Sequence, residues 1–151
     1  MYNNWSMNRI DILGNVWIGD YDAACDFDLM ESNGISHIIS LYRTPVFPDN
    51  YEYLCINIED CENENISIYF DETNKFIDNA LQNGYGILIH CAGGVSRSAT
   101  IVIAYMVYKL KISVDDAINE LKKYRKSINP NRGFIKQLRE YYLCDPNIQK
   151  R

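Results

Sequence analysis

The sequence lacks several features that would assign it to a class at once. No run approaches the roughly 18 apolar residues that a membrane-spanning helix needs, and residues 1–10 are polar, without the apolar segment of a secretory signal. Positive charge is not in excess: 15 Lys and Arg residues stand against 20 Asp and Glu, which gives a net charge of −5 and a pI near 5.0. We therefore expect no membrane association and no nucleic-acid binding through overall charge.

Clusters of metal-binding or disulfide-forming residues are also missing. The five cysteines form an odd, widely spaced set without a C-x-x-C pair: Cys25, Cys55, Cys61, Cys91 and Cys144. Zinc sites and disulfide frameworks use closely or regularly spaced ligands, and the two histidines offer no such spacing. We expect reduced thiols in the cytoplasm, with the nucleus as an alternative, and neither a metal nor another cofactor.

What the chain does contain is the pattern of one α/β domain. Its 151 residues are 47% hydrophobic and 23% charged, as in an ordinary globular protein, so residues 1–151 are predicted to form a single domain with a core of about 10–143. Short apolar strands are predicted at Val16–Gly19, 37–41, 53–56 and 87–89. Helices are predicted at 22–32, 67–83, 99–110, from the capping residue Ser113 to about 126, and at 133–143. This alternation predicts a central, mostly parallel sheet flanked by helices.

The most informative segment follows the apolar strand at 87–89 and leads into a helix that is apolar on nearly all sides. Gly93 and Gly94 permit backbone angles that let amide N–H groups converge on one point, and the start of the next helix adds partial positive charge. Arg97 supplies a charged fork suited to two phosphate oxygens. The segment therefore predicts a binding loop for a tetrahedral oxyanion, at the sheet edge where α/β proteins bind ligands.

Cys91 lies in the same loop. A cysteine at a helix N-terminus or beside a cation can have its pKa lowered from about 8.5 to between about 3.5 and 7.5, so we expect a thiolate that attacks phosphorus. The alternative is a small buried apolar residue at the end of a strand, which is the usual place of a free cysteine. The glycine pair and Arg97, six residues after the cysteine, favour the nucleophile.

The stretch His90-Cys91-Ala92-Gly93-Gly94-Val95-Ser96-Arg97-Ser98-Ala99-Thr100 resembles the signature of cysteine-dependent protein phosphatases, specifically the small, atypical dual-specificity type. Residues 16–24 and 129–138 are similar to other parts of that family, so the resemblance covers about residues 10–143. It implies the phosphatase fold and a phosphocysteine intermediate, with phosphate bound by Ala92, Gly93, Gly94, Val95, Ser96 and Arg97. It also implies that His90 orients the loop and that the Ser98 hydroxyl helps the thiolate leave, with a helix cap as the other interpretation of Ser98.

A general acid must protonate the leaving oxygen. The acidic stretch after the third predicted strand offers Glu59, Asp60, Glu62 and Glu64, and composition alone does not choose among them or exclude a merely solvated loop. The resemblance selects Asp60, five residues before Asn65. On that register, Asn65 is expected to shape the loop or cap the following helix.

The resemblance implies a shallow pocket that admits phosphotyrosine and phosphoserine or phosphothreonine in protein substrates. An RNA 5'-triphosphatase is the second interpretation, although such loops usually end Asn-Arg-Thr. A non-catalytic phosphopeptide-binding module is the third, although both Cys91 and Arg97 are present.

Three smaller hypotheses stay open. The residues Arg125, Lys126 and Arg132 could form a basic rim for a doubly phosphorylated peptide, or simply a solvated helix face. Cys55 or Cys61 could protect Cys91 by a disulfide, although buried structural thiols are the commoner case. The twelve tyrosines leave a homodimer open.

Overall fold

The central sheet carries the site. The computed structural model describes residues 6–143 of the 151, and within that range five strands pair in the order β1-β2-β5-β3-β4. Their bounds are Met7–Arg9 (β1), Val16–Gly19 (β2), Ile35–Ser40 (β3), Glu52–Cys55 (β4) and Gly86–His90 (β5). Strands β2, β5, β3 and β4 are parallel, and β1 joins the edge antiparallel to β2. The predicted mostly parallel sheet is confirmed.

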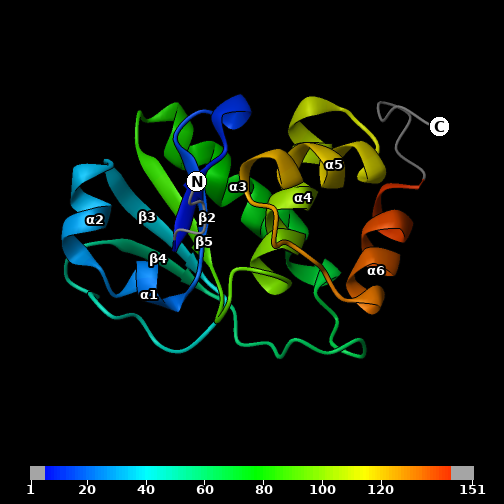
Figure 1. Cartoon of the computed structure of the whole chain (residues 1–151), viewed down its shortest axis with the longest axis horizontal. Helices are drawn as coiled ribbons and strands as arrows, with labels where there is room; N and C mark the ends of the chain where they lie inside the picture. The colour runs from blue at the N-terminus through cyan, green and yellow to red at the C-terminus, as the bar shows by residue number, and fades with distance from the viewer. Residues whose placement is uncertain (1–5, 144–151) are drawn as a thin grey trace.

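Helices cover both faces of this sheet (Figure 1). On one face lie α1 (Tyr21–Ala24) and α2 (Phe27–Ser32), and on the other α3 (Phe70–Gln82), α4 (Arg97–Leu110), α5 (Val114–Tyr124) and α6 (Arg132–Tyr142). Alternate residues of β5 supply the two cores: Ile87 and Ile89 pack with α3 and α4, whereas Leu88 packs with α1 and α2. This is the period of two that a strand buried on both sides requires.

Helix α4 runs through the larger core. Every residue from Ser98 to Val107 is buried, as its nearly continuous apolar sequence predicts. A helix enclosed in this way fixes the position of its first turn, which follows directly on the loop after β5. No helix within residues 6–143 has both the length and the apolar character needed to cross a bilayer.

The predicted single helix over residues 22–32 is wrong. The chain forms two short helices there, because Asp26 begins a new one: its carboxylate accepts a hydrogen bond from the Leu29 N–H (3.0 Å). Asp20 caps α1 in the same way, through the Ala23 N–H. Aspartate at such a position stabilises a helix start more than it does a helix interior. Strand β1, three residues long, was not predicted either.

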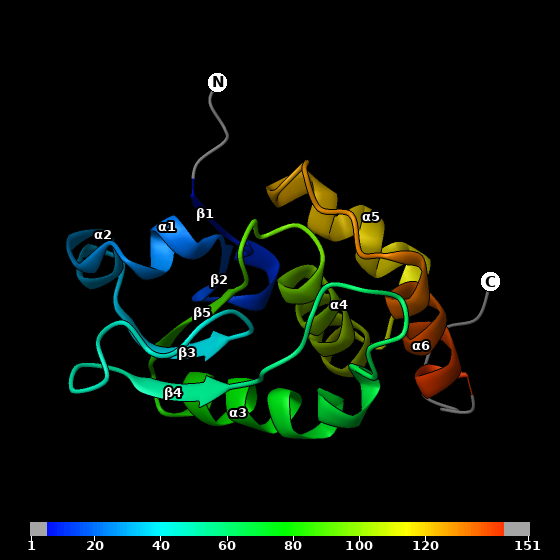
Figure 2. The same ribbon diagram turned by 90° about the horizontal axis from the view of Figure 1, so that it is seen from below.

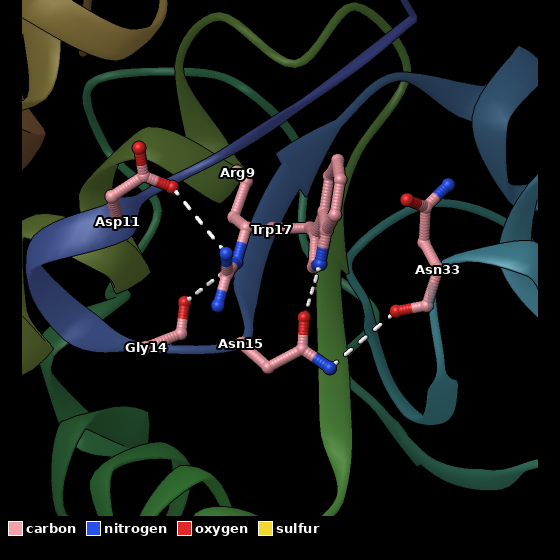
Figure 3. Close-up of polar contacts among 6 residues, drawn as sticks. All are labelled: Arg9, Asp11, Gly14, Asn15, Trp17 and Asn33. Atoms are coloured by element: carbon pink, nitrogen blue, oxygen red, sulfur yellow. Dashed lines mark hydrogen bonds and ion pairs between the residues drawn. The ribbon is translucent and has the colours of Figure 1, made fainter.

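Asn15 holds the end of the sheet that lies opposite the loop between β5 and α4. Figure 3 shows its side-chain oxygen accepting a hydrogen bond from the Trp17 indole (2.8 Å) and its amide donating to the Asn33 carbonyl (3.4 Å). The amide also passes against Gly86 in β5, where a Cβ would collide with it. Strands β2 and β5 are thus aligned at their starts, which sets the position of the loop at their ends.

Candidate active site

The loop between β5 and α4 turns its carbonyl groups outward. Each carbonyl from residue 92 to 96 accepts a hydrogen bond from outside the loop: Ala92 from Tyr21 N (3.0 Å), Gly93 from Arg125 Nη2 (3.3 Å), Gly94 from Arg125 Nε (2.9 Å), Val95 from Asn129 N (2.7 Å) and Ser96 from Thr100 N (2.9 Å). No acceptor within residues 6–143 takes the N–H groups of residues 92–96. A ring of unpaired N–H groups is the arrangement that binds an oxyanion.

Arg125 makes two of these five contacts. It is 8% exposed and also donates to the Asn8 side chain on β1 (2.7 Å). Burial lowers its pKa, while the negative charges of Asp20 and Cys91 oppose that shift. The hypothesis of a basic rim is therefore wrong for Arg125, which is buried and hydrogen-bonds the loop carbonyls. Lys126 and Arg132 are exposed. Gly94 explains part of the geometry: its φ is +67°, and a Cβ there would lie 2.7 Å from Arg125.

Cys91 lies at the base of the loop and is buried, with 2% exposed. Its sulfur is 3.2 Å from the Ser98 hydroxyl in the first turn of α4. The N-cap residue of α4 is Ser96, whose side chain makes no capping hydrogen bond. Ser98 is therefore not the capping residue, and its hydroxyl contacts the Cys91 sulfur. A hydroxyl at this distance can donate a hydrogen bond to a thiolate and stabilise its charge.

Arg97 begins α4 directly after the loop, and its side chain contacts two other segments. Its Nη1 donates to the carbonyls of Leu41 (3.3 Å), after β3, and Ile58 (3.1 Å), after β4. Its Nε is buried and has no hydrogen-bond partner within residues 6–143. A buried guanidinium N–H without an acceptor is costly, and an oxyanion in the loop would supply one. This orphaned donor supports the predicted role of Arg97 in phosphate binding.

His90 ends β5 and is almost fully buried. Burial lowers its pKa to about 4, although its contact with the Cys91 carbonyl opposes the shift. The ring is therefore neutral at pH 7. Its Nδ1 lies 3.3 Å from that carbonyl oxygen, and because a carbonyl only accepts, Nδ1 carries the proton. The contact fits the predicted task of orienting the loop and excludes His90 as a general acid at neutral pH.

Asp60 lies in the loop after β4, which Figure 2 shows running past α4 toward α6 before entering α3. The side chain is exposed, and one carboxylate oxygen accepts a hydrogen bond from Asn131 Nδ2 (2.9 Å). The Asn131 N–H in turn donates to the Ser96 hydroxyl (3.0 Å). One asparagine therefore ties the predicted acid to the oxyanion loop. Glu64 instead folds back and accepts from the Glu59 N–H (2.7 Å), which disfavours it as the acid.

Asn65 does not cap the following helix. Its side-chain oxygen accepts from the Ser67 hydroxyl (3.2 Å), so it shapes the loop, the other role expected of it. The capping contact comes from Gln137 on α6, whose Oε1 accepts from the N–H groups of Ile66 (2.9 Å) and Ser67 (3.0 Å). Gln137 also donates to the Glu64 carbonyl (2.8 Å), which anchors the acid loop to α6.

Of the supporting residues, Asn131 and Gln137 were missed as functional residues, and Arg125 was considered only for a surface rim. Asn131 had a partial signal, since it follows Pro130 and caps α6 by accepting from the Phe134 N–H (2.9 Å). Among the described cysteines, Cys25, Cys55 and Cys61 are exposed, and Cys144 lies outside the described residues. Within residues 6–143, no three histidine, cysteine or acidic side chains gather as a metal site would require.

Comparisons with known proteins agree with this geometry. The profile of the dual specificity phosphatase catalytic domain matches residues 16–144. MAP kinase phosphatase with leucine-rich repeats protein 1 of Dictyostelium discoideum is 40% identical over 131 residues, which are 86% of this chain but only 16% of that protein. Dual specificity protein phosphatase 1B of Arabidopsis thaliana is 35% identical over 133 residues, 87% of this chain and 80% of that protein.

A solved structure shows the same fold. The human tyrosine phosphatase-like serine/threonine/tyrosine-interacting protein superposes with a TM-score of 0.86 at 35% identity, over 91% of this chain and 95% of that one. The likeness of the fold agrees with the profile match, and the chain belongs to the family of dual specificity protein phosphatases, of which residues 16–144 match the catalytic domain.

Proposed function

We propose that this chain hydrolyses phosphotyrosine and phosphoserine or phosphothreonine in proteins, with Cys91 as nucleophile and Asp60 as general acid. The observation that carries the proposal is the loop of residues 92–96, whose carbonyls are all bonded from outside while its N–H groups have no acceptor within residues 6–143. Phosphate bound there would also pair with the buried Arg97 Nε. The sulfur of Cys91 lies at the base of the same loop.

The first chemical step transfers the phosphoryl group to sulfur. The Cys91 thiolate attacks phosphorus, forming an S–P bond as the bond from phosphorus to the substrate oxygen breaks. The loop amides and Arg97 stabilise the equatorial oxygens. Asp60, protonated, gives its proton to the departing oxygen, so that an alcohol or phenol leaves. Asn131 holds the carboxyl group for this transfer.

The second step releases phosphate. The Asp60 carboxylate takes a proton from water as the water oxygen attacks phosphorus, and the S–P bond breaks. The sulfur leaves as a thiolate, which the Ser98 hydroxyl stabilises from 3.2 Å. Because this sulfur must stay reduced, a reducing compartment such as the cytoplasm suits the reaction. The exposed Cys55 and Cys61 remain candidate partners for a protective disulfide.

The experiment compares three substrates: p-nitrophenyl phosphate, a phosphotyrosine or phosphothreonine peptide, and RNA with a 5'-triphosphate. We expect release of phosphate from the first two, abolished in Cys91→Ser. Hydrolysis of the RNA alone would replace this proposal by an RNA 5'-triphosphatase. Peptide binding without turnover by the wild type would assign a phosphopeptide-binding module instead.

A further inference from the structure

Arg43 follows β3 and carries a charged group without a hydrogen-bond or ion-pair partner within residues 6–143. The side chain is exposed, and no hydrogen-bond acceptor or carboxylate within residues 6–143 pairs with its guanidinium. The group is nonetheless held in place, because it lies over two rings, 4.8 Å from the centroid of Tyr42 and 5.7 Å from that of Tyr21. Those rings contact each other edge to face at 5.3 Å.

The backbone is also arranged to present this residue. Arg43 has a φ of +66°, a conformation that costs a non-glycine residue about 1–3 kcal/mol and persists only where neighbouring contacts impose it. Ser40 supplies such contacts: its buried hydroxyl donates to the carbonyl of Tyr42 (3.0 Å) and reaches that of Arg43 (3.5 Å). The turn that carries Arg43 is thus fixed from the end of β3.

The same ring joins Arg43 to the catalytic loop. The Arg97 guanidinium carbon lies 5.5 Å from the Tyr42 centroid, on which Arg43 also stacks. Because both distances are measured to the Tyr42 centroid, the two guanidinium carbons are no more than about 10 Å apart. Tyr21 adds a second link, because its N–H bonds the Ala92 carbonyl of the loop. A second positive charge therefore lies within one peptide side chain's reach of the phosphate-binding arginine.

We propose that Arg43, Tyr42 and Tyr21 form a second anion subsite, which binds the carboxylate or phosphate of a peptide residue two positions from the phosphoresidue under attack. This rests on the proposed function and adds the substrate class. In an extended peptide, residues two apart point to the same side and are separated by about 6.6 Å, which lies within the upper limit of about 10 Å between the two guanidinium carbons. The chain's net charge of −5 repels acidic substrates at long range, so a local cation decides whether they are accepted.

The test measures peptide affinity apart from turnover. Fluorescently labelled phosphotyrosine peptides carry alanine, aspartate or phosphothreonine two residues before or after the phosphotyrosine, and are titrated by anisotropy into Cys91→Ser and Cys91→Ser/Arg43→Asn. Asparagine tolerates a positive φ, so this change removes the charge with little backbone cost. The matched control is Cys91→Ser/Arg132→Asn, which removes an exposed arginine at the start of α6.

We expect the Kd of the best acidic peptide to be about three- to tenfold below that of the alanine peptide. The preference should decline as salt is raised, vanish with Arg43→Asn and survive Arg132→Asn. Preference for aspartate assigns a carboxylate as the ligand, and preference for phosphothreonine alone assigns a second phosphate. No preference in the Cys91→Ser protein, or one lost with Arg132→Asn in place of Arg43→Asn, overturns the subsite. Turnover by the wild-type chain tests the proposed function separately.

Discussion

Arg125→Met tests whether Arg125 keeps the carbonyl groups of the oxyanion loop pointing outward. The change removes the donors to the Gly94 carbonyl (2.9 Å), in a buried hydrogen bond, and to the carbonyl of Gly93 (3.3 Å), which is an exposed residue. A buried carbonyl left without a partner costs about 1–3 kcal/mol. This cost applies to Gly94, whereas water can replace the lost donor at Gly93. The glycine peptides can escape this cost by rotating, but rotation also turns N–H groups away from the bound oxyanion.

The loss must therefore appear in stability, in oxyanion affinity, or in both. We expect the fall in unfolding free energy, from urea denaturation, and the loss of orthovanadate affinity, from inhibition of p-nitrophenyl phosphate hydrolysis, to total at least about 1 kcal/mol. Arg125→Lys, which keeps one cationic donor, should recover part of the loss. Lys126→Met, at the neighbouring exposed position, should stay within about 0.5 kcal/mol of the wild type in unfolding free energy. If Arg125→Met changed neither quantity, the outward carbonyls would not depend on this residue, and the reasoning would be refuted.

Three further predictions follow from the acid and from His90. Asp60→Ala should lower kcat by about 10²–10⁴ with a phosphopeptide but less with p-nitrophenyl phosphate, whose leaving group needs less protonation; equal losses would contradict its role. Asn131→Ser keeps a capping side chain for α6 but removes the donor to Asp60, so kcat should fall about tenfold with the phosphopeptide, and a loss of helix by circular dichroism would count against this interpretation. An unfolded His90 takes up a proton below pH 6.5, whereas the folded one resists until about pH 4. Wild type should therefore lose up to about 3 kcal/mol of unfolding free energy relative to His90→Asn between those pH values, and parallel stability curves would exclude that shift.

Local sequence signals predicted the elements that build the site. The continuous apolar run of β5, the buried sequence of α4 and the glycine pair between them each specify their conformation through neighbours in the chain. The break between α1 and α2 also had a local signal, since Asp20 and Asp26 are capping residues. The apolar residues on both sides of the break keep helical spacing, however, and this spacing predicted one continuous helix. Strand β1 is too short, at three residues, for periodicity to show.

The residues that support the site could not be found in this way, because their partners are distant in sequence. Arg125 bonds a carbonyl 31 residues earlier, Asn131 bonds Asp60 across 71 residues, and Gln137 reaches Glu64 across 73. Each contact depends on how α5 and α6 pack beside the catalytic loop. In the sequence, an arginine at the end of an amphipathic helix has the same pattern whether it faces solvent or a buried carbonyl, so Arg125 was placed on the surface.

The central claim is that the phosphoryl group is transferred to the sulfur of Cys91 before water releases it. Rapid acid quench during p-nitrophenyl phosphate turnover tests this claim most directly. Asp60→Ala should slow the second step and let the intermediate accumulate, since no carboxylate then activates water. Peptide mass spectrometry should find one phosphoryl group on Cys91 in that variant, and none when Cys91→Ser is added. Turnover with no phosphoryl group on Cys91, or with one on another residue, would contradict the account.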